Sequence, residues 1–426
     1  MTIKKINILT TMFLVLFGVG ISQTAEAARL WSAGWELGST ADTGTSYIEA
    51  RVNGSQMTID TTIVHSGTYS AKVTGMSSGV KQLSGIIPST AGTNGPLYAR
   101  GYLNITTLPS AENTIVEGDG LYRITLDASG DLRLYDEDGQ IGLESSALST
   151  GVWYRIEYLI DRTAAAGSHV VRAYINGVEF AGSATRNLSS GFFTLNWGGN
   201  GNGEAQTQGV WYWDDLAVND SSGSVQNGLP GVGSIRVMRP NAAGDAAATA
   251  GLFSDIDEIT PNDATDFIQV DTAIPANYNF ESWANVGGVS NDRITLVQVG
   301  LRHRAESAAS AAFEPQIKSQ SGGTTQTGTN YTHNDVTWHT NFDEIPRGYK
   351  LTSYTDPQAG GAWTPALLDT MIAGVNVTDA DPDVHFSSIW ALVEYVEIPT
   401  PISAPPTTAG LRFFGGLRFF GGLIFR

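Results

Sequence analysis

The residues best suited to chemistry in this chain are carboxylates beside its predicted strands. A strand carrying Glu-x-Asp-x-x-Glu can hydrolyse a glycosidic bond, because alternating side chains bring the nucleophile, a helper and the acid to one face. The nearest match starts at Glu117 and Asp119, but Tyr122 stands where the acid is needed. Retaining hydrolysis requires two carboxyl groups roughly 5 Å apart. We therefore interpret Glu117 and Asp119 as loop charges beside a turn.

Other catalytic residue types give no stronger signal. The sequence contains no cysteine and no P-loop. Its histidines are scattered along the chain without a His-Glu-x-x-His pair, and they stand at positions 65, 169, 303, 333, 339 and 385. The sequence predicts that the protein is not an enzyme.

Aromatic residues are the more useful indication of ligand binding. The chain has ten Trp and fifteen Tyr, and aromatic rings offer flat apolar surfaces on which sugars stack. Trp197 precedes a Gly-rich segment in which Asn200 and Asn202 are able to bond hydroxyl groups. Trp211 and Trp213 are further candidates. These two lie two residues apart and share one strand face, so at least one of them is expected in the core instead.

Composition sets the class of protein. The 426 residues suffice for two ordinary domains, and charged residues make up only 15% of them. Abundant glycine and the absence of cysteine predict an all-β protein stabilised by core size or by a metal ion. The net charge of −18 makes nucleic acid an improbable partner, because phosphate backbones are repelled. It is compatible with calcium and with neutral sugars.

The N-terminus has the features of an export signal. Lys4 and Lys5 precede a short apolar run over residues 8–21, and Ala25-Glu26-Ala27 has the small-x-small pattern of a cleavage site. We expect cleavage after Ala27, a secreted or cell-surface location and no transmembrane span afterwards. The alternative is an uncleaved N-terminal anchor.

Alternating apolar and polar residues predict strands throughout. Asn176-Gly177 is a strong hairpin signal because both residues tolerate positive φ. The pattern predicts one antiparallel meander from residue 121 to residue 180 and a closing strand over residues 210–218. We therefore divide the chain into a signal peptide (1–27), a β-sandwich (28–220), a linker (221–232), a second mainly β domain (233–397), and a Pro-rich segment with a repeat tail (398–426).

Two features of the second half stand out from this β pattern. Thr364 and Pro365 predict the start of a short helix that reaches residue 372. In the tail, the six-residue sequence Leu-Arg-Phe-Phe-Gly-Gly is repeated between Leu411 and Arg426. We expect the repeat either to pack loosely on the body or to mediate self-association or docking on a surface.

Several motifs of the first half resemble those of known sandwich domains. Residues 34–39 and 65–73 resemble the opening strands of bacterial jelly-roll carbohydrate-binding modules. Residues 151–157, 174–177 and 213–218 resemble strands of the concanavalin A-like and laminin-G-like superfamily. The resemblance covers most of residues 29–220. It implies a concanavalin-like jelly-roll β-sandwich for this region.

The same resemblance implies a structural calcium ion. In jelly-roll carbohydrate-binding modules, a Glu on the first strand and an Asp on the closing strand bind Ca²⁺ together with a backbone carbonyl. The matching positions are Glu36 and Asp215, with Asp214 as a possible substitute. The alternative is that Asp214 and Asp215 cap the strand end or pair with arginine.

The second half resembles the module that follows laminin-G-like domains in phage structural proteins. The similarity lies in residues 233–241, 256–263 and 363–364 and in the strand at residues 388–396. It implies another compact β domain.

Together these features predict a non-catalytic, secreted or surface-displayed binding or adhesion protein whose lectin-like domain takes polysaccharide or cell-surface glycan. The alternative is a structural or appendage protein without sugar binding, resembling virion, tail or surface-layer proteins. A diverged hydrolase is the third possibility, and the missing carboxylates argue against it.

Overall fold

The computed structural model describes most of the chain between residues 28 and 398. The described residues are 28–39, 49, 51–53, 57–74, 81–86, 95–118, 122–189, 194–200, 209–271, 275–334, 336–340, 349–379 and 383–398. The predicted signal peptide and the repeat tail lie outside them. No helix in these ranges is long and apolar enough to cross a membrane.

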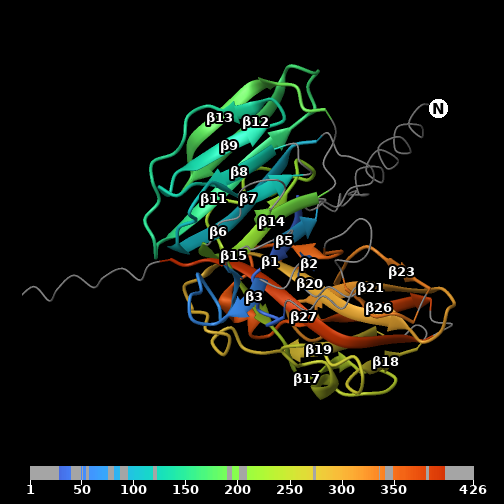
Figure 1. Cartoon of the computed structure of the whole chain (residues 1–426). Coiled ribbons are helices and arrows are strands. Elements are labelled where there is room, and N and C mark those ends of the chain that lie inside the picture. Colours follow the sequence, from blue (N-terminus) through green and yellow to red (C-terminus); the bar gives the residue numbers. More distant parts are fainter. Residues whose placement is uncertain are drawn as a thin grey trace, which may run out of the picture.

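Two antiparallel sheets form a sandwich from the first half of the chain, in the upper part of Figure 1. One sheet has the order β13-β12-β11-β6-β15-β4-β3 with β1 also paired to β15, and the other has the order β10-β9-β8-β7-β14-β5-β2. Their strands are β1 (Arg29–Ala33), β2 (Arg51–Asn53), β3 (Met57–Asp60), β4 (Ser70–Thr74), β5 (Lys81–Ile86), β6 (Leu97–Thr107), β7 (Asn113–Gly118), β8 (Tyr122–Leu126), β9 (Leu132–Asp136), β10 (Gly139–Ile141), β11 (Trp153–Asp161), β12 (His169–Ile175), β13 (Val178–Arg186), β14 (Thr194–Asn200) and β15 (Val210–Asn219).

Two further antiparallel sheets are built from the second half. The first has the order β16-β27-β20-β24, with β18 on β27 and β25 on β20, and the second has the order β17-β19-β26-β21-β22, with β23 on β21. The elements are β16 (Ser234–Met238), β17 (Pro240–Ala246), η1 (Phe253–Asp255), β18 (Ile268–Val270), β19 (Pro275–Phe280), β20 (Arg293–Ala305), β21 (Ala311–Lys318), β22 (Gln326–Thr327), β23 (Tyr331–His333), β24 (His339–Thr340), β25 (Thr352–Ser353), α2 (Pro365–Leu368), β26 (Ile372–Asp379) and β27 (Val384–Val396).

These sheets confirm the prediction of an all-β sandwich protein. The Asn176-Gly177 turn joins β12 to β13 with both residues at positive φ, as the hairpin signal predicts. Helix α2 begins after Thr364, whose side chain accepts a hydrogen bond from the Leu367 N–H. It ends at Leu368 rather than near residue 372, because β26 begins there and pairs with β19 and β21. The finer assignment to a concanavalin-like jelly roll stays a prediction.

The prediction of one continuous meander from residue 121 to residue 180 is wrong. β8, β9 and β10 lie in the seven-stranded sheet, whereas β11, β12 and β13 lie in the eight-stranded sheet. The segment between them crosses the sandwich edge. Its Leu148 N–H donates to the Gly130 carbonyl beside β9, and its Gly151 N–H donates to the Ile105 carbonyl of β6. These two hydrogen bonds fix the segment at both ends as it crosses from one sheet to the other.

The two sandwiches pack directly against each other, with β1 and β15 at their boundary in Figure 1. Leu37 of the first sandwich joins a small buried cluster with residues of β16, β20 and β27, namely Ile235, Val237, Leu296, Trp390 and Leu392. The hydroxyl of Tyr354 also accepts a hydrogen bond from the Arg29 N–H at 2.8 Å. The segment between β15 and β16 therefore joins two bodies that share a buried apolar contact.

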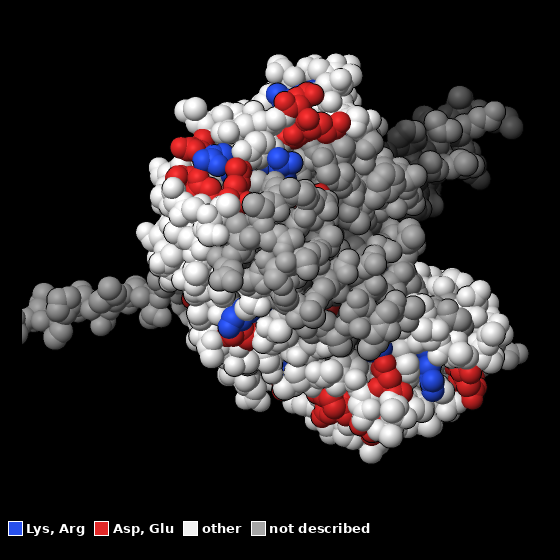
Figure 2. Space-filling model, viewed as in Figure 1, with Lys and Arg blue, Asp and Glu red and all other residues white. Residues whose placement is uncertain are grey.

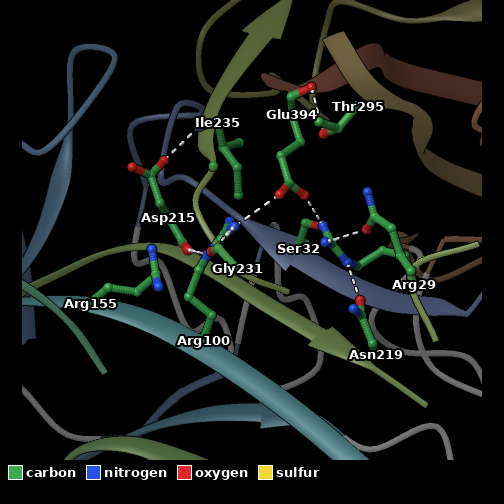
Figure 3. Close-up of polar contacts among 12 residues, drawn as sticks. Arg29, Ser32, Arg100, Arg155, Asp215, Asn219, Gly231, Ile235, Thr295 and Glu394 are labelled. Atoms are coloured by element: carbon green, nitrogen blue, oxygen red, sulfur yellow. Dashed lines mark hydrogen bonds and ion pairs between the residues drawn. The ribbon is translucent and has the colours of Figure 1, made fainter. Parts of the chain in front are cut away.

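A buried carboxylate lies at the centre of this boundary (Figure 3). Glu394 of β27 pairs with Arg29 of β1 and, at 2.8 Å, with Arg100 of β6. All three side chains are at most 1% exposed. Arg29 is further held by Asn219 and Ser32, and Arg100 donates to the carbonyls of Asp215 and Gly231.

The two arginines also determine the charge state of Glu394. Burial by itself raises the pKa of this carboxyl, but Arg29 and Arg100 outweigh it and lower the pKa below its ordinary value. Glu394 is therefore ionised at neutral pH and compensates two buried cations from the other domain.

We predict that Glu394→Gln destabilises the whole protein by about 3–5 kcal/mol, because it leaves two arginines buried without an anion. Urea unfolding monitored by tryptophan fluorescence measures the loss. Glu179→Gln is the matched control, since Glu179 pairs with Arg172 at an exposed site and its removal is expected to change stability by less than about 1 kcal/mol. Equal effects of the two substitutions would contradict the role given to Glu394.

Candidate functional site

A row of polar side chains crosses the outward face of the seven-stranded sheet. Strand register places Glu117 of β7 between Asn196 of β14 and Arg123 of β8, and Arg123 pairs in turn with Tyr135 of β9. Because strand side chains alternate, this row points away from the core. The alternate positions on the same strands are core residues, namely Val116, Ile124, Leu134, Leu195 and Trp197. We call Glu117, Arg123, Tyr135 and Asn196 the polar face.

The chemistry of the polar face suits hydroxyl groups. The Arg123 guanidinium lies 4.7 Å from the centre of the Tyr135 ring, so a planar donor group and an aromatic ring adjoin. Asn196 is only 7% exposed, and its side-chain oxygen has no hydrogen-bond partner among the described residues. Because this amide oxygen is itself buried, a ligand hydroxyl would reach it only after the side chains that cover it move.

Beside the polar face, Arg133 of β9 balances a group of acidic side chains. Its guanidinium pairs with Glu112 at 3.1 Å, with Asp127 at 2.8 Å and with Glu144 at 2.9 Å. In the described ranges, one trio of carboxylates brings an oxygen of each within 4.8 Å of the others, and it consists of Asp127, Asp131 and Glu144. Because Arg133 bonds two of these three carboxylates, we interpret the trio as an ion-pair network.

Charges of both signs adjoin on the visible surface as well. Figure 2 shows basic and acidic side chains lying beside one another on the first sandwich, without a broad field of one sign. This part of the surface therefore presents no strong field of one sign to an approaching charged ligand.

The structure contradicts the candidate sugar-stacking role of Trp197, Trp211 and Trp213, and it confirms the expectation that at least one of Trp211 and Trp213 is a core residue. Their exposures are 1%, 0% and 0%, and all three belong to the core of the first sandwich. The Trp211 indole N–H donates to the Gly198 carbonyl at 2.8 Å and so links the two sheets. The rings fill the space between the sheets because the sandwich interior requires large apolar side chains.

The remaining predicted polar residues give little further information. Asn200 is the last residue of β14. Asn202 and Asp119 lie outside the described residues. The interpretation of Glu117 as a loop charge is wrong, because Glu117 lies within β7 and pairs with Arg123 of β8. Tyr122 is 1% exposed and packs in the core against Tyr158, with ring centres 5.8 Å apart. Glu117 and Tyr122 therefore point to opposite faces of the sheet.

A second group of functional interest is a set of buried carboxylates at the domain boundary. It contains the predicted residues Glu36, Asp214 and Asp215 together with Glu49, and we call these four residues the carboxylate cluster. The loop of residues 65–69 connects three of them. Asp214 accepts the His65 N–H at 2.8 Å, Asp215 accepts the Ser66 hydroxyl at 2.8 Å, and Glu36 accepts the Thr68 N–H at 2.9 Å. The fold thus brings the opening Glu and the closing Asp to one edge.

The carboxylate cluster also touches the second domain. Asp215 accepts the backbone N–H of Ile235, the second residue of β16, at 2.6 Å. The Glu36 carbonyl accepts a hydrogen bond from Arg239 at 2.5 Å. His65 pairs with Asp215 at 2.5 Å and stacks on Tyr102 with ring centres 3.6 Å apart. The cluster is therefore part of the contact between the two sandwiches.

Backbone strain is concentrated at this edge. Among the described residues, four other than glycine have positive φ, and two of them are Trp35 (65°) and Asp215 (49°). A bulky residue such as Trp35 adopts this conformation only where the surrounding structure enforces it. Gly67 in the loop also has positive φ, and a Cβ there would lie 2.1 Å from a Glu36 carboxylate oxygen. Only glycine lets the loop close over Glu36.

Burial gives these carboxyl groups unusual pKa values. Burial raises the pKa of Glu36 to about 7, against the lowering effect of the Thr68 and Tyr69 N–H groups, and nearby Asp215 raises it further. Burial and then Glu36 raise the pKa of Glu49 to about 8. The pKa of Asp214 is also well above its ordinary value, because of burial and then Asp215 and Glu36. Burial and mutual repulsion therefore favour the protonated, uncharged form of these carboxyl groups.

Sequence reasoning missed Glu49 and three of the four polar-face residues. Glu49 accepts the Leu37 N–H at 3.3 Å, and its second oxygen has no hydrogen-bond partner. No sequence motif marks it. Arg123 and Tyr135 alternate with core residues in two predicted strands, so their outward direction could have been read from the pattern. Their alignment with Asn196 depends on strand order, which the pattern does not contain.

Comparisons with known proteins give weak structural likenesses. No protein-family profile and no curated protein sequence matches the chain. The cellulose-induced protein Cip1 is 20% identical with a TM-score of 0.34, over 47% of this chain and 99% of that protein. The ligand-binding domain of botulinum neurotoxin serotype D, solved with N-acetylneuraminic acid, is 16% identical with a TM-score of 0.34, over 47% of this chain and 48% of its own. Trypanosoma rangeli sialidase is 12% identical with a TM-score of 0.33, over 45% of this chain and 30% of its own.

Proposed function

We propose that this protein is an exported, non-catalytic glycan-binding protein whose first sandwich binds a polysaccharide on the polar face. The observation that carries the proposal is the row from Asn196 to Tyr135, which combines an unsatisfied amide oxygen, a carboxylate, a guanidinium and an aromatic ring on one sheet face. Such a mixture of donors, acceptors and one ring suits a polyhydroxylated ligand. Export is inferred from the sequence of residues 1–27.

The arrangement around Glu117 supports the absence of catalysis in this proposal. The core position of Tyr122 puts it on the opposite sheet face from Glu117, so this strand pair does not form the carboxylate pair of a retaining glycosidase.

A serine-hydrolase elbow is a second catalytic motif to consider. The sequence Gly75-Met-Ser77-Ser-Gly79 has its spacing, although it lies outside the described residues. It connects β4 to β5, whereas an elbow connects a strand to a helix.

A structural or appendage role without sugar binding is the second candidate. It is favoured by the boundary between the sandwiches, where a buried ion pair and an apolar cluster hold the two bodies together. A rigid two-domain unit of this kind suits a protein that transmits load or repeats in an array.

A structural calcium ion is the second part of the proposal. The carboxylate cluster offers a hard divalent cation oxygen ligands that are distant in the sequence. Glu36, Asp214 and Asp215 do not bring an oxygen of each within 4.8 Å of one another, so their side chains would have to converge on the ion. Glu36 and Asp215 would hold the ion, with Asp214 beside them. The ion would neutralise the buried charge and so fasten the edge of the first sandwich to the start of β16.

Glycan binding is tested with the double substitution Arg123→Ala and Tyr135→Ala. We predict that it weakens binding of the purified chain to its glycan by about tenfold or more, because it removes both the guanidinium and the ring. Affinity electrophoresis against a panel of cell-wall and algal polysaccharides gives the measurement. Arg172→Ala with Tyr174→Ala is the matched control on the outward side of the other sheet. Unretarded migration of the unaltered chain on every polysaccharide would favour the structural role.

Calcium binding is tested by thermal unfolding. We predict a melting temperature several degrees higher in calcium than in chelator, because a bound ion stabilises only the folded chain. Glu36→Gln is expected to abolish the difference. Glu144→Gln, in the acidic trio paired by Arg133, is expected to preserve it. Identical melting in calcium and chelator would rule out the site.

The raised pKa values predict how stability varies with pH in chelator. A carboxyl whose folded pKa lies above its unfolded value stabilises the fold fully below the unfolded pKa, and this stability is lost as pH rises through the folded pKa. For Glu36 and Glu49 the window runs from about 4.5 to about 7 and 8. We expect the free energy of unfolding from urea titrations to fall by a few kcal/mol between these limits. Glu49→Gln should flatten the decline, and Glu179→Gln should not.

A further inference from the structure

One corner of the second sandwich combines an arginine, two aromatic rings and a histidine. Arg304 lies on β20 and His385 lies opposite it on β27. Phe267 precedes β18, and Trp338 precedes β24. Strand pairing brings these four residues together from four segments, and we call them the Arg304 corner.

The guanidinium of Arg304 packs against two rings, whose centres are themselves 6.1 Å apart. Its central carbon lies 4.7 Å from the centre of the Trp338 ring and 5.4 Å from that of the Phe267 ring. Phe267 in turn stacks on His385, with ring centres 4.7 Å apart. These contacts restrict the Arg304 side chain before any ligand binds. Less conformational entropy is therefore lost when its N–H groups bind an acceptor.

Most of the donors at this corner have no acceptor among the residues that the structure describes. Arg304 Nε donates to His385 Nδ1 at 3.4 Å, which is a long hydrogen bond. Burial and then Arg304 lower the pKa of His385, so its ring is neutral and the hydrogen lies on Nε2. That Nε2 is buried without a hydrogen-bond partner. His385 itself is 7% exposed.

Arg302, two residues earlier on the same strand, provides a contrast. It pairs with the carboxylate of Asp263, and that carboxylate also accepts the Ser387 hydroxyl. Arg304 forms no ion pair with any carboxylate in the described part of the chain. The acidic groups that act on His385 are Glu306 and Asp383, and the Asp383 carboxylate accepts a hydrogen bond from Gln269. The Arg304 guanidinium is only partly buried and faces no anion of its own.

We propose that the Arg304 corner binds the carboxylate of an acidic sugar residue, with the guanidinium as the donor and the half-buried Phe267 beside the sugar ring, while the buried Trp338 ring supports the guanidinium from within. A restrained guanidinium presents parallel N–H groups that match the two oxygens of a carboxylate. A neutral hydroxyl uses this fork less well. The choice of a sugar as the carrier of the carboxylate follows from the proposed function, whereas the carboxylate site itself does not depend on it.

The experiment is isothermal titration of the purified chain, at low ionic strength, with the trimers of galacturonic and mannuronic acid. Their methyl esters serve as the uncharged counterparts, and acetate serves as a free carboxylate. We expect at least one acid trimer to bind, and its ester and acetate to bind about tenfold more weakly or worse. Arg304→Gln should weaken binding of the acid trimer by about tenfold, and Arg304→Lys should restore it only in part.

Arg172→Gln removes the same charge at an exposed ion pair of the first sandwich and should leave binding of the trimer unchanged. Melting temperatures of all variants verify that each is folded. The double substitution at Arg123 and Tyr135 should also preserve trimer binding, which separates this site from the polar face.

Three results would overturn the proposal. These are equal binding of acid and ester, full binding by the Arg304→Gln variant, and no binding of either acid trimer. Acetate binding as strong as that of the trimer would overturn its sugar component.

Discussion

The structure depends on one buried electrostatic contact, in which Glu394 of the second sandwich compensates Arg29 and Arg100 of the first. Neither arginine is tolerable in that interior without an anion, and the anion is not tolerable without them. Arg100 also donates a hydrogen bond to the carbonyl of Asp215, the residue of β15 that has positive φ. The buried ion pair and this strained residue of β15 therefore share the Arg100 side chain. The position of the second domain and the shape of the carboxylate cluster are therefore coupled through one side chain.

Because of this coupling, the carboxylate cluster is held in place by contacts from both domains, which an isolated sandwich would lack. Asp215 bonds the first strand of the second domain, and Glu36 lies beside Trp35 in its left-handed conformation. The positive φ angles of Trp35 and Asp215, and the close approach of several carboxyl groups, persist only where surrounding contacts enforce them. Here those contacts come from both domains. A cation at this edge would stabilise the boundary as well as the first sandwich.

The two proposed ligand sites differ in how they would recognise a glycan. The polar face belongs to one sheet and mixes donors with acceptors, which suits hydroxyl groups of a neutral chain. The Arg304 corner is built from four segments and presents donors that lack acceptors. A rigid connection between the sandwiches would let a single polymer contact both sites at a fixed separation, so that binding at one raises the effective concentration at the other.

Local patterns predicted a substantial part of the fold. Period-two alternation identified strands such as β11 and β15, and Asn176-Gly177 identified a hairpin turn because its φ requirement is local. Thr364 and Pro365 marked the first residue of α2 for the same reason. The meander failed because alternation is identical for strands of either sheet. The orientation of Trp197 failed because a tryptophan suits a binding face and a sandwich interior equally well.

By itself the amino-acid sequence determined the all-β class, several strand boundaries, the Asn176-Gly177 turn and the start of α2, because these follow from side-chain size, polarity and local φ preferences. Tertiary structure alone decided that three tryptophans are core, that Glu49 joins Glu36, and that Arg304 meets Trp338 and Phe267. The physical reason is that each of these outcomes depends on which strands pair and which sheets stack. Strand pairing and sheet stacking depend on the summed packing energy of segments that are distant in the sequence, so a local sequence pattern does not predict them.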